Sequence, residues 1–340
     1  MPPSLKLPVP VDDLAAARKG DLVVLTWTPP SQTTDRENIR HPGKTVICRA
    51  IGEYPITRCV DVVKELSQSD LRSAEPDSRN PQVLFEGVLP QNTGNPLQFV
   101  TYAIEVLNSR GRNAGLSNQV RVSLAPTLPP PTDLRAEVVA SGVELAWTAA
   151  SRASIANMPR ELSFHYRLYR RVAGQQNYTE VEDVPLNAGE IRVHDPSFEW
   201  EKTYDYKVVP ITEVALKGIS PFEIEGNDSP TVRIFVHDTF APGAPTGLQA
   251  VYSGVGQKPF IDLTWAPNME SDLAGYNLFR HEQGQAPQKI NSALLKAPSF
   301  RDDNVQPGKT YYYSVTAVDL RGNQSQPSGE ASESVPSENR

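Results

Sequence analysis

The sequence predicts an all-β protein built from three repeated units, and three observations lead to this prediction. The first is composition, because the 340 residues include 31 prolines but only 3 methionines, with no long apolar helical stretch. The second is an alternation of apolar and polar residues, typical of half-buried strands, that returns three times along the chain. The third is the spacing of Trp27, Trp147 and Trp265, which stand about 120 residues apart and so give the size of one unit.

Each unit begins with a proline-rich stretch and two short strands, the second of which ends at the tryptophan. These second strands are LVVLTW (22–27), GVELAW (142–147) and FIDLTW (260–265). Because successive side chains of a strand point to opposite faces, every second residue of these stretches belongs to one buried row. The tryptophan closes that row, so we expect Trp27, Trp147 and Trp265 to be core anchors.

Two further strands repeat in the same order. The third strand ends in arginine in every unit, over TVICR (45–49), YRLYR (166–170) and YNLFR (276–280). A late strand then carries apolar and aromatic residues at alternate positions, which predicts a second inward row. The tyrosines of these rows are Tyr102, Tyr204, Tyr206, Tyr311 and Tyr313. A glycine-containing turn follows, as expected for a hairpin.

Together these residues resemble the signature of fibronectin type III modules. The family's early tryptophan is found in all three units, and its late-strand tyrosine is matched by Tyr204 and Tyr311, whereas the first unit has Val100 there. The family's Asn-x-x-Gly turn is matched by Asn108–Gly111 and, with aspartate, by Asp319–Gly322. The resemblance covers nearly the whole chain and implies three tandem immunoglobulin-like β-sandwiches. It implies little about function, because this fold serves many unrelated binding roles.

The chain as a whole also resembles bacterial cell-surface lipoproteins with tandem modules, of a type associated with acidobacteria, and residues 2–35 carry this likeness. In such proteins a lipid-bearing cysteine precedes this segment, so we expect membrane contact only through an anchor outside the sequence. Residues 1–20 lack the continuous apolar stretch of a signal peptide. A cytosolic protein and a trimmed mature chain both fit that observation. The resemblance favours the second, with a location in the cell envelope, in the periplasm or at the cell surface.

The units are joined by short proline-rich segments, APTLPPPTDL (125–134) and HDTFAPGAPTGL (237–248). Proline fixes φ and favours a semi-rigid spacer, which predicts an elongated array. The expected domains are residues 1–126, 127–238 and 239–340. Phe240 in the second segment is expected to pack between modules, with a ligand contact as the alternative.

The units are longer than a minimal module, and the additional residues are expected in loops. The first unit has an insertion near 61–81, in which VVKELSQSDLR is compatible with a short helix. The second unit has additional residues at 151–162 and 214–229. Loops on a rigid sandwich often carry binding residues, but they can equally be decoration.

Cys48 and Cys59 are the two cysteines of the chain, with ten residues between them. Cys48 alternates with Ile47, which predicts a side chain that points away from the core, and Cys59 falls where the next strand returns. Two outward cysteines on a returning pair of strands favour a disulfide, and an extracytoplasmic setting supports it. Two free thiols are the alternative, and the spacing matches no zinc site.

Charge and motifs argue against several functional classes. The formal net charge is −7 and no run of lysine and arginine is present, which argues against nucleic-acid binding. No segment approaches the roughly 18 apolar residues of a membrane helix. The sequence contains no G-x-S-x-G elbow and no P-loop. We therefore predict a protein that is not an enzyme and has no cofactor or metal, with a weak calcium site involving Asp238, Glu270 or Asp272 as a minor alternative.

Outer-face aromatic residues are the remaining candidates for binding. Tyr169 and Phe279 alternate with inward residues of the third strand, and Tyr312 lies between the inward tyrosines of the late strand. Outward aromatic side chains suit a partner surface or a sugar platform. With Phe240 these three residues are the predicted surface contacts, and cross-strand packing on a half-covered face is the alternative.

Two functions remain compatible with these features. The first is a non-catalytic cell-envelope or extracellular scaffold or adhesion protein that binds a protein partner, or that serves as a subunit of a larger assembly. The second is a carbohydrate-binding accessory protein of a polysaccharide-degrading or adhesion system. A sugar platform requires several coplanar exposed aromatic residues on one sheet face, and the candidates are scattered, so the sequence favours the scaffold.

Overall fold

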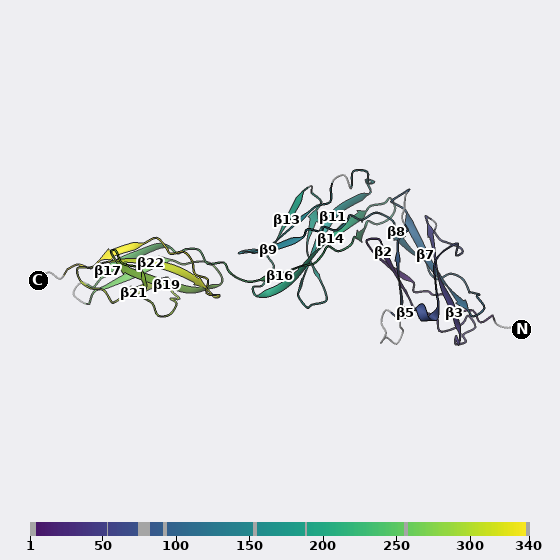
Figure 1. Cartoon of the computed structure of the whole chain (residues 1–340), viewed down its shortest axis with the longest axis horizontal. Coiled ribbons are helices and arrows are strands. Elements are labelled where there is room, and N and C mark those ends of the chain that lie inside the picture. Colours follow the sequence, from purple (N-terminus) through teal and green to yellow (C-terminus); the bar gives the residue numbers. More distant parts are fainter. Residues whose placement is uncertain are drawn as a thin grey trace. The chain divides into compact units, whose positions relative to one another are not determined.

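The computed structural model is an all-β structure whose strands are labelled in Figure 1. It describes residues 5–52, 54–73, 82–90, 94–151, 155–187, 189–254 and 258–337. The strands within these ranges form six antiparallel sheets that associate in three pairs. The predicted fold class, tandem β-sandwiches, is therefore confirmed.

The chain divides into two compact units. The first unit is made of Met1–Glu137, Gly142–Phe198 and Lys202–Phe235, and the second is made of Val138–Ser141, Glu199–Glu201 and Val236–Arg340. Two of the sandwiches lie in the first unit, and the third sandwich lies in the second unit. The domain boundaries expected after residues 126 and 238 stay predictions.

The first sandwich consists of two four-stranded sheets. One sheet has the order β1 (Ala15–Lys19), β2 (Leu22–Trp27), β6 (Val83–Val88) and β5 (Arg72–Ser73). The other has the order β4 (Asp61–Leu66), β3 (Pro42–Ile51), β7 (Phe99–Asn108) and β8 (Val120–Ser123). Alternate residues of the two sheets form one buried cluster, in which Leu25 and Trp27 from β2 meet Ile47 from β3 and Tyr102 from β7.

The second sandwich repeats this arrangement with longer strands. One sheet has the order β13 (Glu190–Asp195), β10 (Gly142–Thr148) and β9 (Arg135–Val139). The other has the order β12 (Thr179–Pro185), β11 (Leu162–Val172), β14 (Lys202–Val214) and β15 (Phe222–Glu225), and β16 (Val232–Val236) also pairs with β14. The two sheets meet where Trp147 packs edge-on against Tyr166, with ring centroids 5.9 Å apart.

The third sandwich lies in the second compact unit. One sheet has the order β17 (Thr246–Ser253), β18 (Phe260–Ala266) and β21 (Ser299–Asp302). The other has the order β20 (Gln288–Lys289), β19 (Leu273–Glu282), β22 (Thr310–Asp319) and β23 (Ala331–Ser334). Trp265 and Tyr276 repeat the edge-on aromatic contact, with ring centroids 5.2 Å apart.

The eight residues expected to anchor the cores are all at most 5% exposed. They are Trp27, Trp147, Trp265, Tyr102, Tyr204, Tyr206, Tyr311 and Tyr313. Every second residue of β2, β10 and β18 points into a core in the same way, because a strand places alternate side chains on opposite faces.

A buried Arg–Asp–Tyr triad joins the two sheets in the second and third sandwiches. In the third, Arg280 of β19 and Tyr313 of β22 both donate hydrogen bonds to Oδ2 of Asp302 on β21, at 2.7 and 2.9 Å. Burial, followed by the Asp302 carboxylate, raises the pKa of Tyr313 well above its usual value, so its hydroxyl stays a donor. The triad explains why arginine repeats at this position, which lies two residues before the end of the third strand rather than at its end.

The same triad is formed in the second sandwich by Arg170, Tyr206 and Asp195, at 2.6 and 2.8 Å. The first sandwich lacks it. Gly87 lies opposite Val23, at the position that corresponds to these aspartates. The third-strand arginine of the first sandwich, Arg49, instead pairs at 2.6 Å with Asp61 on the neighbouring strand of its own sheet.

The prediction of a short helix within VVKELSQSDLR is wrong for most of this segment. Residues 61–66 form β4, which pairs with β3 from Thr45 to Arg49, and only Gln68–Asp70 form a single 3₁₀ turn. Pairing with the edge of an existing sheet outweighs a local helical pattern, since it gives the backbone a hydrogen-bonded partner and buries Leu66. Residues 74–81 of the expected insertion lie outside the described residues.

The first two sandwiches contact each other within the first compact unit. Lys19 of β1 lies between Glu225 of β15 and Asp228, with nitrogen–oxygen distances of 3.2 and 2.6 Å. Ala125 and Leu128, in the first proline-rich segment, are buried. This segment is therefore packed against the protein rather than extended through solvent.

Candidate interaction surface

A disulfide-closed loop crosses the outer face of the first sandwich. Cys48 lies on β3, Cys59 lies two residues before the start of β4, and the predicted disulfide joins them with a Cα–Cα distance of 5.2 Å. Because β3 and β4 are neighbouring antiparallel strands, the chain between them has to return across the edge of the sheet. We call residues 54–60 of this loop the strap.

The strap covers part of the face that the alternation of β3 leaves outward. Cys48 was expected to point away from the core, and it lies in a cluster separate from that core, where it is fully buried. Ile56 of the strap packs against Cys48 and Ala103 in a second, smaller apolar cluster. Gln119 holds the strap down, because Ile56 N donates to its Oε1 at 2.9 Å and its Nε2 donates to the Ile56 carbonyl oxygen at 2.7 Å.

A cation–π contact forms a third attachment of the strap. The Arg121 guanidinium lies 5.1 Å from the ring centroid of Tyr54 and 4.4 Å from that of Phe99. An arginine over an aromatic face within about 6 Å is attracted by the ring quadrupole. Disulfide, glutamine and arginine thus fix the strap at three points along seven residues.

The fixed strap and the strands beside it present apolar side chains to solvent. Val60 is 72% exposed and Tyr54 is 56% exposed, while Ile51 at the end of β3 and Val62 on β4 are about half exposed. Four large apolar side chains within twelve residues of sequence are thus exposed. β4 is also an edge strand, so one side of its backbone is open to pairing with another chain.

We expect loss of the disulfide to lower the free energy of unfolding of the first sandwich by about 2–3 kcal/mol, because the crosslink restricts a short loop of the unfolded chain. Denaturant unfolding of the oxidised and the dithiothreitol-treated protein measures this difference. A Cys48→Ala/Cys59→Ala variant should be insensitive to dithiothreitol. Equal stability of the oxidised and reduced protein would contradict the prediction.

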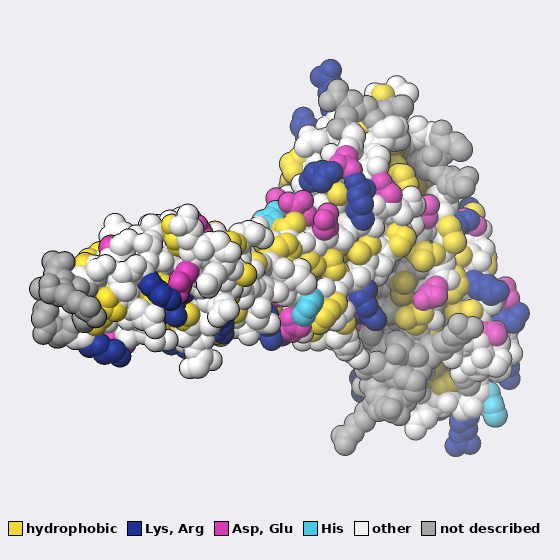
Figure 2. Space-filling view, turned by 60° about the vertical axis from the view of Figure 1, so that its left-hand side comes forward, with side chains coloured by type: hydrophobic (Ala, Val, Ile, Leu, Met, Phe, Trp, Pro, Cys, Tyr) yellow, Lys and Arg dark blue, Asp and Glu magenta, His cyan; other side chains and the backbone are white. Residues whose placement is uncertain are grey.

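The aromatic residues expected on outer faces are half-buried in cross-strand contacts. Tyr169 donates a hydrogen bond to Glu225 at 3.1 Å, and Tyr312 stacks on His281 with ring centroids 5.2 Å apart. Phe279 is half-buried on β19. Their role as ligand contacts stays a prediction. On the face drawn in Figure 2, hydrophobic side chains are interspersed with charged ones rather than gathered in one hollow.

Phe240 of the second proline-rich segment packs against Trp200, with ring centroids 6.0 Å apart. Both residues belong to the second compact unit, and Phe240 is half-buried. Two exposed aromatic residues were not singled out from the sequence, Tyr54 and Phe235, and Tyr54 belongs to the strap. The alternation of strands gives no signal for Tyr54, because it lies in a loop.

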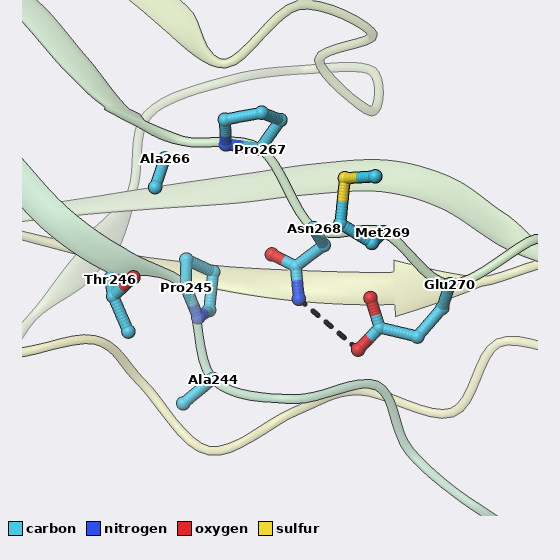
Figure 3. Close-up of a pocket in the computed structure, with 8 residues that line it drawn as sticks. All are labelled: Ala244, Pro245, Thr246, Ala266, Pro267, Asn268, Met269 and Glu270. Carbon is cyan, nitrogen blue, oxygen red and sulfur yellow. Dashed lines mark hydrogen bonds between the residues drawn. The ribbon is translucent and has the colours of Figure 1, made fainter.

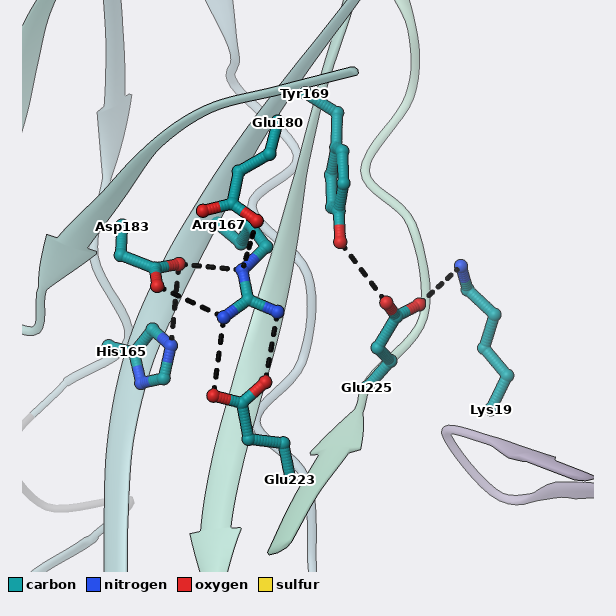
Figure 4. A network of polar contacts seen from close by, with 8 residues as sticks. All are labelled: Lys19, His165, Arg167, Tyr169, Glu180, Asp183, Glu223 and Glu225. Carbon is teal, nitrogen blue, oxygen red and sulfur yellow. Dashed lines mark hydrogen bonds and ion pairs between the residues drawn. The ribbon is translucent and has the colours of Figure 1, made fainter. Parts of the chain in front are cut away.

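The outer face of the second sandwich carries a charge network centred on Arg167 (Figure 4). Its guanidinium contacts Asp183 of β12 at 2.7 Å, Glu223 of β15 at 2.9 Å and Glu180 at 3.4 Å. The hydrogen bonds that Arg167 donates to Asp183 and Glu223 raise the pKa of Arg167, and Arg167 in turn lowers the pKa of Asp183. These charges are already paired with each other, so the network holds three strands together and offers little to a ligand.

A hollow of about 480 Å³ lies at the start of the third sandwich, lined by Ala244–Thr246 and Ala266–Glu270. Figure 3 draws these lining residues. Glu270 accepts a hydrogen bond from Gly243 N at 2.7 Å, and the Asn268 side chain donates to the Gly243 carbonyl oxygen at 2.8 Å. Both polar side chains therefore hold the second proline-rich segment to the sandwich. Met269 on the rim is 89% exposed.

Two histidines on the outer faces lie beside carboxylates. His165 lies 3.5 Å from Asp183, and His281 lies 2.8 Å from Glu330. Such pairs hold neighbouring strands or loops together. The two pairs themselves contain no nucleophilic side chain. Within the described ranges no helix is long and apolar enough to cross a membrane.

Comparison with known proteins gives short stretches of sequence similarity. No protein-family model matches the chain. An amylopullulanase of Thermoanaerobacterium thermosulfurigenes is 38% identical over 96 residues, which is 28% of this chain and 5% of that protein. An amylopullulanase of Thermoanaerobacterium saccharolyticum is 39% identical over 91 residues, which is 26% of this chain and 6% of that protein. The chain thus spans only a small fraction of the curated relatives it matches.

One solved structure aligns with most of the chain, and another aligns with about a third of it. The FN1–FN3 domains of chicken CNTN1 are 16% identical, with a TM-score of 0.28, over 97% of this chain and all of that one. A Fn3-like protein from Clostridium thermocellum is 30% identical, with a TM-score of 0.25, over 30% of this chain and all of that one.

Proposed function

We propose that the chain is a non-catalytic, extracytoplasmic array of fibronectin type III-like modules that binds a protein partner through the strap. The observation that carries this proposal is a rigidly held loop with exposed apolar side chains. Tyr54 and Val60 remain exposed although the loop is fixed by a disulfide and by Gln119. A loop already ordered in its final conformation loses little entropy on binding, which favours affinity.

Three features support this proposal. The disulfide suits an oxidising compartment outside the cytoplasm. The edge strand β4 adjoins the strap and can extend its sheet with a partner strand, while the exposed Val62 supplies an apolar contact. The charged groups of the Arg167 network are already paired, whereas the strap presents exposed apolar side chains.

The test is capture of envelope protein by the tagged full chain, compared with two matched variants. Val62 on β4 and Val251 on β17 are both about half-exposed valines on edge strands. We expect Val62→Asp to weaken capture of one stoichiometric protein about tenfold or more. Val251→Asp should capture it as the unchanged chain does. Equal capture by both variants, or capture of no protein, would contradict the proposal.

A second candidate function is carbohydrate binding as an accessory part of a polysaccharide-degrading system. The stretch similar to amylopullulanases favours it. Co-sedimentation of the full chain with insoluble starch, and retardation in gels containing pullulan, measure this activity directly. Retention of the chain on polysaccharide that Tyr312→Ala abolishes would support carbohydrate binding. If the chain is not retained, protein binding is the remaining candidate function.

A further inference from the structure

Three aspartates of the second compact unit converge on one point. Asp238 lies in the second proline-rich segment, Asp272 directly precedes β19, and Asp319 ends β22. One carboxylate oxygen from each lies within 4.8 Å of the other two. Two oxygens bound to the same calcium ion are at most about 5 Å apart, because each lies 2.3–2.6 Å from the ion. The spacing therefore suits one shared cation.

A buried carboxylate oxygen in this cluster lacks a hydrogen-bond partner. Asp238 and Asp319 are 3% and 2% exposed. Asp238 Oδ1 accepts a hydrogen bond from Phe240 N at 3.1 Å, whereas its Oδ2 is buried without a partner. Burial, and then the nearby Asp319 and Asp272 carboxylates, raise the pKa of Asp238 above its usual value. A buried oxygen of this kind is costly unless something binds it.

The other buried aspartates show how this protein usually compensates such a charge. Each of them pairs with arginine, in the contacts Asp195–Arg170, Asp205–Arg171, Asp205–Arg233 and Asp302–Arg280. Within the part of the chain that the structure describes, neither Asp238 nor Asp319 forms an ion pair. The cluster thus has carboxylates in place but no positive charge from the protein itself.

The first sandwich contains an uncharged counterpart of Asp319. Asn108 ends β7 at the corresponding position, and its Oδ1 accepts hydrogen bonds from two backbone N–H groups of the following turn, at 2.9 and 3.0 Å. Asp319 Oδ1 accepts the same two bonds, from Arg321 N and Asn323 N, both at 2.8 Å. The two backbone hydrogen bonds of the turn need only this oxygen, so they do not require the negative charge of Asp319. Its Oδ2 accepts a further hydrogen bond from the Asn323 side chain at 2.8 Å.

We propose that Asp238, Asp272 and Asp319 bind one calcium ion, with carbonyl oxygens or water completing its coordination. Hard oxygen ligands on loops are the donors that calcium prefers. The ion would connect the second proline-rich segment to one end of the β19–β22 pair, where Leu273 lies opposite Asp319. Of the three acidic residues considered from the sequence, Glu270 is not a ligand, because it binds Gly243 N instead. Asp319 takes its place, and the site is independent of the strap.

The test uses the full chain after treatment with EDTA, titrated with CaCl₂ in a calorimeter and then melted. We expect one calcium ion per chain, and a rise in the melting temperature of the second compact unit by roughly 4 °C or more at saturation. A matched concentration of NaCl should give no such rise, since screening alone does not replace a bound ion.

Three variants separate loss of the site from loss of the fold. Asp319→Asn reproduces the turn of Asn108, and Asp238→Asn removes the carboxylate with the unpartnered oxygen. Both should lose calcium binding, yet in EDTA both should melt at or above the temperature of the unchanged chain, because they relieve repulsion among carboxylates. Asp303→Asn, which alters an exposed carboxylate of the same sandwich, should bind calcium normally.

Two outcomes would overturn the proposal. One is an absence of heat and of melting shift up to about 10 mM calcium, a concentration above the weakest class of extracellular sites. The other is a calcium-dependent shift that persists in both Asp319→Asn and Asp238→Asn.

Discussion

Replacing Asp302 by alanine should lower the free energy of unfolding of the third sandwich by about 3–5 kcal/mol. The substitution leaves the Arg280 guanidinium and the Tyr313 hydroxyl without their shared acceptor. Breaking a buried ion pair from one side is costly because the remaining charge stays buried and unpaired. Arg280 keeps about a fifth of its side chain exposed, so water offsets part of the loss and the lower end of the range is expected.

Hydrogen-exchange mass spectrometry of the full chain in increasing denaturant resolves this effect, since peptides of 246–334 report on the third sandwich alone. Tyr313→Phe removes one hydrogen bond to the carboxylate and should cost about 1.5–3 kcal/mol. Asp303→Ala changes an exposed neighbour and should stay within about 0.5 kcal/mol of the unchanged chain. If Asp302→Ala resembles Asp303→Ala, the triad does not stabilise the sandwich.

The cores could be predicted because they depend on local periodicity. The row that ends at Trp27 can be read from six consecutive residues, and its repetition at Trp147 and Trp265 shows that the pattern is structural. The arginine that repeats near the end of each third strand was also visible in the sequence. Its partner was not, because Asp302 lies on the opposite sheet, and only the folded chain brings it to Arg280.

The surfaces could not be predicted, because they depend on contacts between distant segments. One of the contacts that hold the strap over Cys48 comes from Gln119, which is 63 residues from Ile56. Likewise Asp238 and Asp319 are far apart in the sequence, and nothing in the spacing of either residue indicates the other. Alternation gives the face on which a side chain lies, but it does not show whether a loop will cross that face.

Replacing Trp147 by alanine should lower the free energy of unfolding of the second sandwich by about 3–5 kcal/mol, comparable to the loss of the triad. The side chain is fully buried, and its removal leaves a cavity that the two sheets fill only partly. The edge-on contact with Tyr166 is lost as well. Tyr166 is itself fixed by the hydrogen bond that its hydroxyl accepts from Ala150 N at 2.8 Å, so it cannot readily move into the space.

Trp147→Phe provides the matched control, because Trp147 Nε1 is buried without a hydrogen-bond partner. Phenylalanine keeps an aromatic ring against Tyr166 and removes no hydrogen bond, so it should cost less than about 2 kcal/mol. Exchange of peptides from 135–236 in the full chain measures both variants. Equal losses for alanine and phenylalanine would mean that the indole itself, rather than the volume and the aromatic contact, stabilises the core. A large difference would establish that the repeated tryptophan is selected for filling the space between the sheets.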